Sequence, residues 1–217
     1  MFNFGYKHDY ILERCVGRTV LDLGCIDAEL CSGRRQTGVW LHDKIRNTAN
    51  RVVGVDVLAD QIEVLREIGY DIRFGDLEAL ENLDLGFIPD VIVAADVIEH
   101  LGNPGLFLNG VKRFCGPDTE LIITTPNAFY WKRFWWALRR QEPVREDHTC
   151  WYSHSTLNQV VRRYGFRINE DVLTAPLKLH VTGSTSAVDA SALLLSRRLS
   201  NWLVLVASLK LHEIDVA

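Results

Sequence analysis

This 217-residue sequence lacks several features that mark particular classes of protein. Its five cysteines are odd in number and include no C-x-x-C pair, so they indicate neither a disulfide framework nor a zinc knuckle, and a reducing cytoplasmic location is expected. The first ten residues have no basic segment followed by an apolar core, so no secretory signal is expected there. The longest late apolar run, residues 202–209, is far shorter than the roughly 20 residues that span a bilayer, so no transmembrane segment is expected.

A strong positive charge is also missing. The formal net charge is −4 and the isoelectric point is about 6.0. This balance argues against a protein that coats nucleic acid, and no DNA partner is expected, although a local basic patch would suffice to bind a strand end. Hydrophobic residues make up 47% of the chain, which is enough for a substantial core. Because we find no internal repeat, low-complexity tract or flexible linker, we expect one domain over residues 1–217.

Short β-rich runs alternate with amphipathic segments along the chain. This alternation predicts an α/β fold, a Rossmann-like doubly wound and mostly parallel sheet with helices on both faces. In such sheets ligands bind at the carboxyl ends of the strands. The predicted strands are 19–23, 51–55, 70–74, 90–94, 121–125, 166–173 and 202–209, and the main predicted helices are 39–49, 61–68, 103–114 and 157–164.

Three carboxylates follow three consecutive predicted strands. Asp22 lies near the end of the first strand, Asp56 ends the second and Asp76 comes just after the third. An acidic residue that ends the second strand is placed to accept hydrogen bonds from ribose hydroxyls. Any one of these acids alone would be interpreted as a solvated turn residue. The three together, with Gly24 in the first loop, favour a nucleoside site.

At these residues the sequence resembles the class I S-adenosylmethionine-dependent methyltransferases. The resemblance runs from about Arg18 to Lys210 and implies a seven-stranded sheet whose last strand is antiparallel, with the methyl donor bound across the first four strands. The motifs that carry it are VLDLGC (20–25), VVGVDV (52–57), GDLEAL (75–80), DVIVAADVIEHL (90–101), LIITTPN (121–127) and the pair WYSHSTL and YGF (151–157 and 164–166).

The resemblance also implies a set of residues that bind the donor. The methionine portion would lie against Gly24 and Cys25, the ribose on Asp56 with Val57, the adenine beside Asp76 and Leu77 and the amino group near the backbone of Ala95, while Asp22 orients the first loop.

The first loop departs from the family pattern at two positions. Ile26 and Ala28 stand where the family usually has glycines that let the backbone approach the ligand. Asp56 also follows Gly24 by 32 positions, against roughly 20 in dinucleotide-binding folds, which disfavours a dehydrogenase. S-adenosylmethionine has no pyrophosphate that needs a glycine cradle. We therefore expect a remodelled but working donor loop, and the alternative is a binding protein that keeps the fold without the donor.

The candidate acceptor residues follow the fourth strand. Asp96, Glu99 and His100 stand at i, i+3 and i+4 and would face one way on a helix. In one interpretation Asp96 and Glu99 form a capping box. In another, these three residues converge with His148 to hold a divalent metal that orients an acceptor hydroxyl pair. Without a metal, His148 or His100 would act as the general base.

This second arrangement resembles the methyltransferases that modify the 3′-terminal ribose 2′-hydroxyl of small RNAs. Their metal residues match Asp96 (a glutamate in that family), Glu99, His100 and His148. The same Glu-His pair and downstream histidine also occur in ubiquinone-type and other small-molecule O-methyltransferases. Glu99, His100 and His148 are therefore the candidate catalytic residues, and whether they bind a metal stays open.

Residues 127–140 interleave six aromatic residues with four cations. One interpretation is a helix whose aromatic side chains complete the core. The other is a lid over the acceptor site, inserted over residues 127–150, with Tyr6 and His8 contributing an edge. This composition suits an aromatic, sugar-phosphate or nucleic acid substrate. It equally suits a helix at a membrane surface that reaches a lipid-linked substrate.

We therefore predict an S-adenosylmethionine-dependent O-methyltransferase that acts on a small molecule, a sugar or a lipid-linked glycan. The second choice is a metal-dependent RNA ribose 2′-O-methyltransferase. Beyond a connection between the last two strands, the segment from Thr174 to Ser200 carries no pattern that we can interpret.

Overall fold

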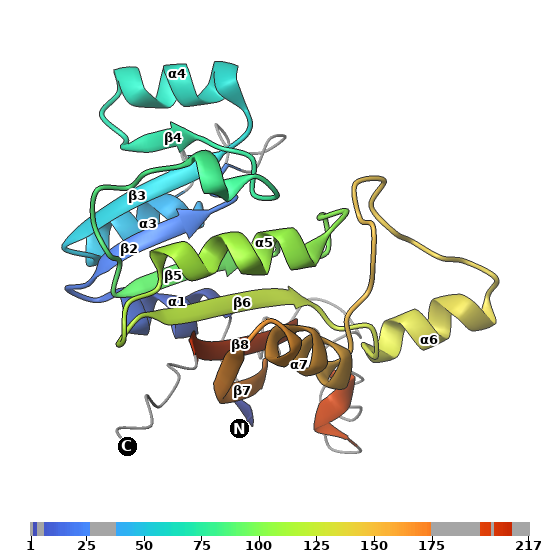
Figure 1. Cartoon of the computed structure of the whole chain (residues 1–217). Coiled ribbons are helices and arrows are strands. Elements are labelled where there is room, and N and C mark those ends of the chain that lie inside the picture. The colour runs from blue at the N-terminus through green and yellow to red at the C-terminus, as the bar shows by residue number, and fades with distance from the viewer. Residues whose placement is uncertain (1, 4–6, 27–37, 175–195, 201, 210–217) are drawn as a thin grey trace, which may run out of the picture.

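The computed structural model describes residues 2–3, 7–26, 38–174, 196–200 and 202–209. Their strands form one mixed sheet in the order β1-β7-β8-β6-β5-β2-β3-β4, which Figure 1 shows edge to edge. The seven predicted strands and the α/β class are confirmed. The strands are β1 (Phe2–Asn3), β2 (Thr19–Leu23), β3 (Arg51–Asp56), β4 (Ile72–Phe74), β5 (Val91–Ala95), β6 (Glu120–Pro126), β7 (Phe166–Thr174) and β8 (Trp202–Leu209).

Strand directions follow the expected pattern. β2, β3, β4, β5 and β6 pair in parallel, and β8 inserts antiparallel between β6 and β7. The two-residue strand β1, which the sequence did not predict, adds to β7 in parallel. Because β2, β3, β4 and β5 run in the same direction, their carboxyl ends meet at one edge, where the predicted donor residues lie.

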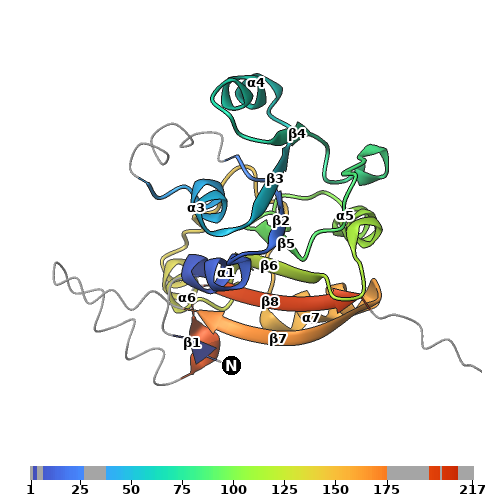
Figure 2. The same ribbon diagram turned by 90° about the vertical axis from the view of Figure 1, so that its left-hand side faces the viewer.

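Helices cover both faces of the sheet, with α1 and α3 on one face and α5 and α7 on the other (Figure 2). Each face has its own apolar core, which includes Ile11 and Ile45 on the first and Phe107 and Val161 on the second. The helices are α1 (Lys7–Cys15), α3 (Leu41–Thr48), α4 (Ala59–Glu67), α5 (Pro104–Val111), α6 (Trp131–Leu138) and α7 (His154–Arg163), with short 3-10 helices at Leu80–Asn82, Lys112–Phe114 and Arg197–Leu199. None of the described helices is long and apolar enough to cross a membrane.

The helical arrangement considered for Asp96, Glu99 and His100 does not occur. Residues 96 and 98–100 form turns, and Asp96 has a φ of 55°, which a right-handed helix does not permit. The next helix begins at Pro104, and the side chain of Asn103 caps it by accepting hydrogen bonds from the backbone N–H groups of Gly105 and Leu106. The capping box proposed for Asp96 and Glu99 is therefore absent, and a capping box occurs instead at Ser153 and Thr156, where α7 begins.

The segment between β6 and α7 leaves the sheet and returns to the same place. Asn127 and Tyr152 form an isolated parallel bridge, and the N–H of Ala128 donates to the carbonyl of Tyr152 at 2.8 Å. The Asn127 amide also donates to the carbonyls of Arg198 and Ser200, both at 2.8 Å. Between the bridged residues the chain carries α6, which projects beyond the end of β6 (Figure 1).

Candidate active site

Gly24 lies at the centre of the predicted donor edge. Its φ is 68°, and its N–H donates to the carbonyl of Val55 at 2.8 Å. A Cβ at this position would lie 2.6 Å from Cγ2 of Val97 and 3.7 Å from Cδ1 of Leu77. The loops after β2, β4 and β5 therefore converge here, and only glycine leaves room for the backbone to pass.

Asp56 anchors the first loop to the second strand. Its carboxylate accepts hydrogen bonds from the backbone N–H groups of Ile26 at 2.8 Å, Val57 at 2.8 Å and Leu58 at 3.3 Å. Burial raises the pKa of this carboxyl, and the three backbone donors oppose that shift. A carboxylate has about four acceptor sites, so Asp56 keeps capacity for a ribose hydroxyl while it holds the loop in place.

Ile26 packs beneath the loop. Its side chain is buried in an apolar cluster with Trp40, Ile62 and Tyr70. Ile26, which stands where the family usually has a glycine, therefore packs in the core between the sheet and helices α3 and α4. Ala28, the second departure, lies outside the described residues, as do Tyr6 and the segment 175–195.

A buried polar pair supports the same loop. Asp22 and His42 are both almost fully buried, and Oδ2 of Asp22 lies 2.8 Å from Nδ1 of His42. The indole N–H of Trp40 donates to the carbonyl of Cys25 at 2.9 Å. The pairing of Asp22 with His42 joins positions 20 residues apart and could not be predicted from the sequence. The part of Asp22 in orienting the first loop stays a prediction.

The remaining predicted donor residues lie around Gly24. Leu77 is buried against the loop, whereas Asp76 is exposed and accepts a hydrogen bond from the N–H of Glu78 at 2.8 Å. Val57 is exposed, and Ala95 ends β5 half-buried. Cys25 is buried, so it offers its backbone to a ligand more readily than its thiol. The roles assigned to these residues stay predictions.

On the acceptor side, Glu99, His100 and His148 come together. Each offers a ligand atom, and these atoms lie within 4.8 Å of one another. Glu99 is 1% exposed, and neither of its carboxyl oxygens has a hydrogen-bond partner within the described part of the chain. Burial raises the pKa of Glu99 to about 7, against smaller lowerings by its own backbone N–H and by the nearby Thr125 hydroxyl. Burial of a charged carboxylate without a partner costs free energy. Glu99 at this position is therefore expected to keep its proton or to pair with a cation.

Backbone hydrogen bonds bring His148 to this group. The N–H of Thr149 donates to the carbonyl of Glu99 at 2.8 Å, and its hydroxyl donates to the carbonyl of Leu101 at 2.7 Å. These bonds tie the 145–150 segment to the turn after β5. Thr149 and Asp147 were not predicted as site residues, because the contacts join positions about fifty residues apart.

The two histidines are electrostatically distinct. Nδ1 of His100 lies 3.2 Å from the carbonyl oxygen of Asp147, and since a carbonyl can only accept, this nitrogen donates the hydrogen bond. The His148 ring meets the His100 ring edge-on at 4.6 Å. Burial, followed by the charge of His100, lowers the pKa of His148. His148 is therefore neutral near pH 7 and available as a base or a ligand.

Asp96 does not join this group, so the predicted convergence of all four residues is wrong. Its carboxylate forms an ion pair with Lys7 of α1 and accepts a hydrogen bond from the Thr124 hydroxyl at 3.0 Å. The first contact joins the side chain to α1, and the second joins it to β6. His8 is also buried in α1.

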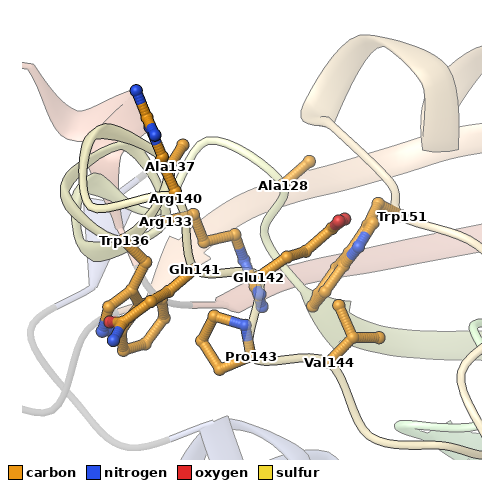
Figure 3. Close-up of a pocket in the computed structure, with 10 residues that line it drawn as sticks. All are labelled: Ala128, Arg133, Trp136, Ala137, Arg140, Gln141, Glu142, Pro143, Val144 and Trp151. Carbon is orange, nitrogen blue, oxygen red and sulfur yellow. The ribbon is translucent and has the colours of Figure 1, made fainter.

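A pocket of about 560 Å³ lies beside this group. Trp151 connects the two, since its ring is 5.5 Å from the His148 ring and the Arg133 guanidinium lies 3.4 Å from its centre. Figure 3 shows the lining side chains, which come from α6 and the segment that follows it, with Ala128 from the chain before the helix. They are Ala128, Arg133, Trp136, Ala137, Arg140, Gln141, Glu142, Pro143, Val144 and Trp151.

Comparison with known proteins decides the family. The family model described as a methyltransferase domain matches residues 7–171, and this span includes every residue of the site described above. The chain belongs to this methyltransferase family.

Two relatives and one solved structure illustrate the similarity. An S-adenosylmethionine-dependent methyltransferase of Mycolicibacterium smegmatis is 30% identical over 77% of the chain and 60% of its own length. The ubiquinone biosynthesis O-methyltransferase of Bartonella tribocorum is 28% identical over 55% of the chain and 45% of its own length. The N-methyltransferase NodS of Bradyrhizobium japonicum, solved with S-adenosylhomocysteine, has a TM-score of 0.57 at 13% identity, covering 94% of this chain and 86% of its own.

These methyltransferases support S-adenosylmethionine as the cofactor of the family and confirm the Rossmann-like fold. The chain spans 60% or less of the length of these two relatives. At 13% identity the likeness to NodS shows the fold alone. Gly24, which has a positive φ and no β-carbon, and the buried carboxylate of Asp56, which accepts three of its roughly four possible hydrogen bonds, lie at the carboxyl ends of β2 and β3 and fit the methionine portion and the ribose of the donor.

Proposed function

We propose that this protein transfers the methyl group of S-adenosylmethionine to a hydroxyl oxygen of a small molecule, a sugar or a lipid-linked glycan. The observation that carries the proposal is the Glu99, His100 and His148 group. It lies directly beyond Val97, whose side chain closes around Gly24 of the donor loop. The O-methyltransferase name of the Bartonella relative agrees with this chemistry.

The reaction needs few groups. The acceptor oxygen forms a bond to the methyl carbon as the bond from that carbon to sulfur breaks, and the electron pair stays on sulfur to give the neutral thioether. The hydroxyl proton passes to a base, for which we propose the neutral imidazole of His148 or the carboxylate of Glu99. Positioning and the exclusion of water contribute much of the rate in such a displacement.

A metal-dependent form is the second candidate, and the same group supports it. Two imidazoles and a buried unpaired carboxyl suit a divalent ion, which when bound would lower the pKa of an acceptor hydroxyl. Glu99, His100 and His148 would hold it. RNA ribose 2′-O-methylation is one reaction of this type. Asp96 lies outside the group, so the RNA-methyltransferase set is incomplete here.

The non-catalytic alternative rested on Ile26 and Ala28. Ile26 packs into the core beneath the loop, which favours a loop that still accepts the donor. We further propose that residues 127–150 form the lid of the acceptor site, because α6 and the chain after it line the pocket beside His148.

Titration calorimetry tests the donor site. We expect S-adenosylmethionine and S-adenosylhomocysteine to bind in the micromolar range and NAD not to bind. Asp56→Ala is expected to weaken binding roughly ten- to hundredfold, because hydrogen bonds to a charged group contribute about 1.5–3 kcal/mol each. Exposed Asp84→Ala is the matched control. Absence of donor binding to folded wild-type protein would contradict the enzyme proposal and favour the binding protein.

Chelation separates the two enzymatic candidates. A coupled assay that detects S-adenosylhomocysteine finds the acceptor among phenols, sugars and RNA ends, with and without Mg²⁺ or Mn²⁺. If His148 acts as the base, EDTA leaves the rate unchanged and His148→Ala lowers it roughly a hundredfold. If the group holds a metal, EDTA abolishes the rate and added metal restores it. Activity that survives both treatments would refute both assignments.

A further inference from the structure

Helix α6 buries none of its side chains. Phe134 is 69% exposed, Leu138 62% and Trp135 47%. Phe129, two residues before the helix, is 60% exposed. Large apolar side chains that gather on one short element indicate an interaction surface.

The side chains of α6 divide into two opposite stripes at helical spacing. Arg133, Trp136 and Ala137, followed by Arg140, line the pocket beside the candidate catalytic group. The other stripe faces away from the pocket and consists of Trp131, Phe134, Trp135 and Leu138. One stripe of the helix therefore faces the pocket, and the apolar stripe lies on the surface of the protein.

The charge on this element is of one sign. Residues 127–141 contain Lys132, Arg133, Arg139 and Arg140 and no acidic residue, although the whole chain carries a net charge of −4. Two of these cations flank the apolar stripe. The Arg139 guanidinium lies 4.7 Å from the Trp135 ring centre and the Lys132 ammonium 5.6 Å from that of Trp131.

Aromatic side chains bordered by cations are typical of helices that lie in a bilayer interface, where the rings enter the headgroup region and the cations meet anionic lipid. We propose that α6 is an interfacial helix that docks the protein on an anionic lipid surface. We call the exposed side chains Phe134, Trp135 and Leu138, with Lys132 and Arg139, the docking face.

The position of α6 also indicates a substrate class for the proposed function. This part of the inference rests on that function. The acceptor pocket lies on the inner side of the helix whose outer side would enter the bilayer interface. An acceptor that is itself held in the membrane would then reach His148 without crossing bulk water. The substrate class that fits is an amphipathic, membrane-borne hydroxyl compound. Docking itself is testable without any knowledge of the acceptor.

Vesicle co-sedimentation tests the docking face. The full chain is mixed with vesicles of phosphatidylcholine containing about 30% phosphatidylglycerol, or of phosphatidylcholine alone, at low and high salt. We expect the wild type to pellet with the anionic vesicles, to bind neutral ones at least roughly fivefold less and to be released at about 0.5 M salt.

Three variants identify the surface responsible. Phe134→Glu combined with Leu138→Glu, and separately Lys132→Gln combined with Arg139→Gln, are each expected to lower the bound fraction at least roughly fivefold. Val64→Glu on α4, where Val64 is 60% exposed, is the matched control and should bind as the wild type does. S-adenosylhomocysteine binding, unchanged in all three, verifies the fold independently of docking.

Several results would overturn the proposal. One is a wild type that stays in solution with anionic vesicles at low salt. Another is a pair of docking-face variants that bind as well as the wild type does. Self-association in sedimentation velocity that Phe134→Glu with Leu138→Glu abolishes, without vesicle binding by the wild type, would assign the face to a second copy of the chain. A wild type that binds the anionic vesicles but does not bind S-adenosylhomocysteine would instead contradict the proposed function and leave the docking face supported.

Discussion

Replacement of Glu99 by glutamine is expected to raise the free energy of unfolding relative to the wild type by an amount that grows from near zero at about pH 4.5 to about 3 kcal/mol at about pH 8. The folded-state pKa of Glu99 is about 7, against an ordinary value of 4.5. As the pH rises through this window, the unfolded chain releases the proton while the folded chain retains it. Wild-type stability therefore falls across the window and levels off above pH 7, and the glutamine variant lacks this loss.

Urea denaturation across this pH range, in the presence of EDTA, measures the difference. Glu63→Gln, at an exposed position of α4, should follow the wild-type curve. Equal pH dependence in Glu99→Gln and the wild type would show that Glu99 is solvated or already paired. The same variant is expected to lower the methylation rate roughly a hundredfold or more, because it removes the carboxylate as a base or a ligand.

Gly24→Ala is expected to abolish donor binding, with a loss of affinity greater than roughly a hundredfold. The added Cβ would stand 2.6 Å from the stiff, buried side chain of Val97, and the φ of 68° is unfavourable for alanine. Relief of this clash requires the first loop or Val97 to shift, and either shift changes the position of the backbone against which the methionine portion of the donor is predicted to lie. We also expect the free energy of unfolding to fall by about 2–4 kcal/mol.

Gly86→Ala is the control that separates the backbone strain of a positive φ from the steric clash of an added Cβ. Gly86 has nearly the same φ, 70°, but a Cβ there would meet nothing within 4 Å. Calorimetry with S-adenosylhomocysteine and thermal melts of both variants supply the comparison. If Gly24→Ala binds the donor as Gly86→Ala does, the close approach at Gly24 has no part in donor binding.

Much of the sheet could be predicted because its signals are local. Runs such as 91–95 and 121–125 are apolar and β-branched, and each is bounded by polar or turn-forming residues. Their alternation with amphipathic segments determines the parallel arrangement. Helix α1 could not be predicted in this way, since Lys7 and His8 are buried in it although both are polar.

The acceptor site depended on contacts that no local pattern encodes. The spacing of Asp96, Glu99 and His100 indicated a helix, but the ion pair with Lys7 draws Asp96 away and the turn after β5 presents only the other two. His148 was a candidate by motif, and its position depends on the hydrogen bonds from Thr149 to a turn about fifty residues earlier. The support of Asp22 by His42 is equally long-range.

The bridge between Asn127 and Tyr152 separates the segment between these residues from the sheet. Because the chain departs from and returns to one fixed point, the length between the bridged residues is free to vary without changing the register of any strand, and loop-closure entropy grows only slowly with that length. The donor half of the protein lies in the strands on the other side of this point. Residues 128–151, which include the proposed lid, can therefore change in length and sequence while the strands that carry the predicted donor residues keep their register.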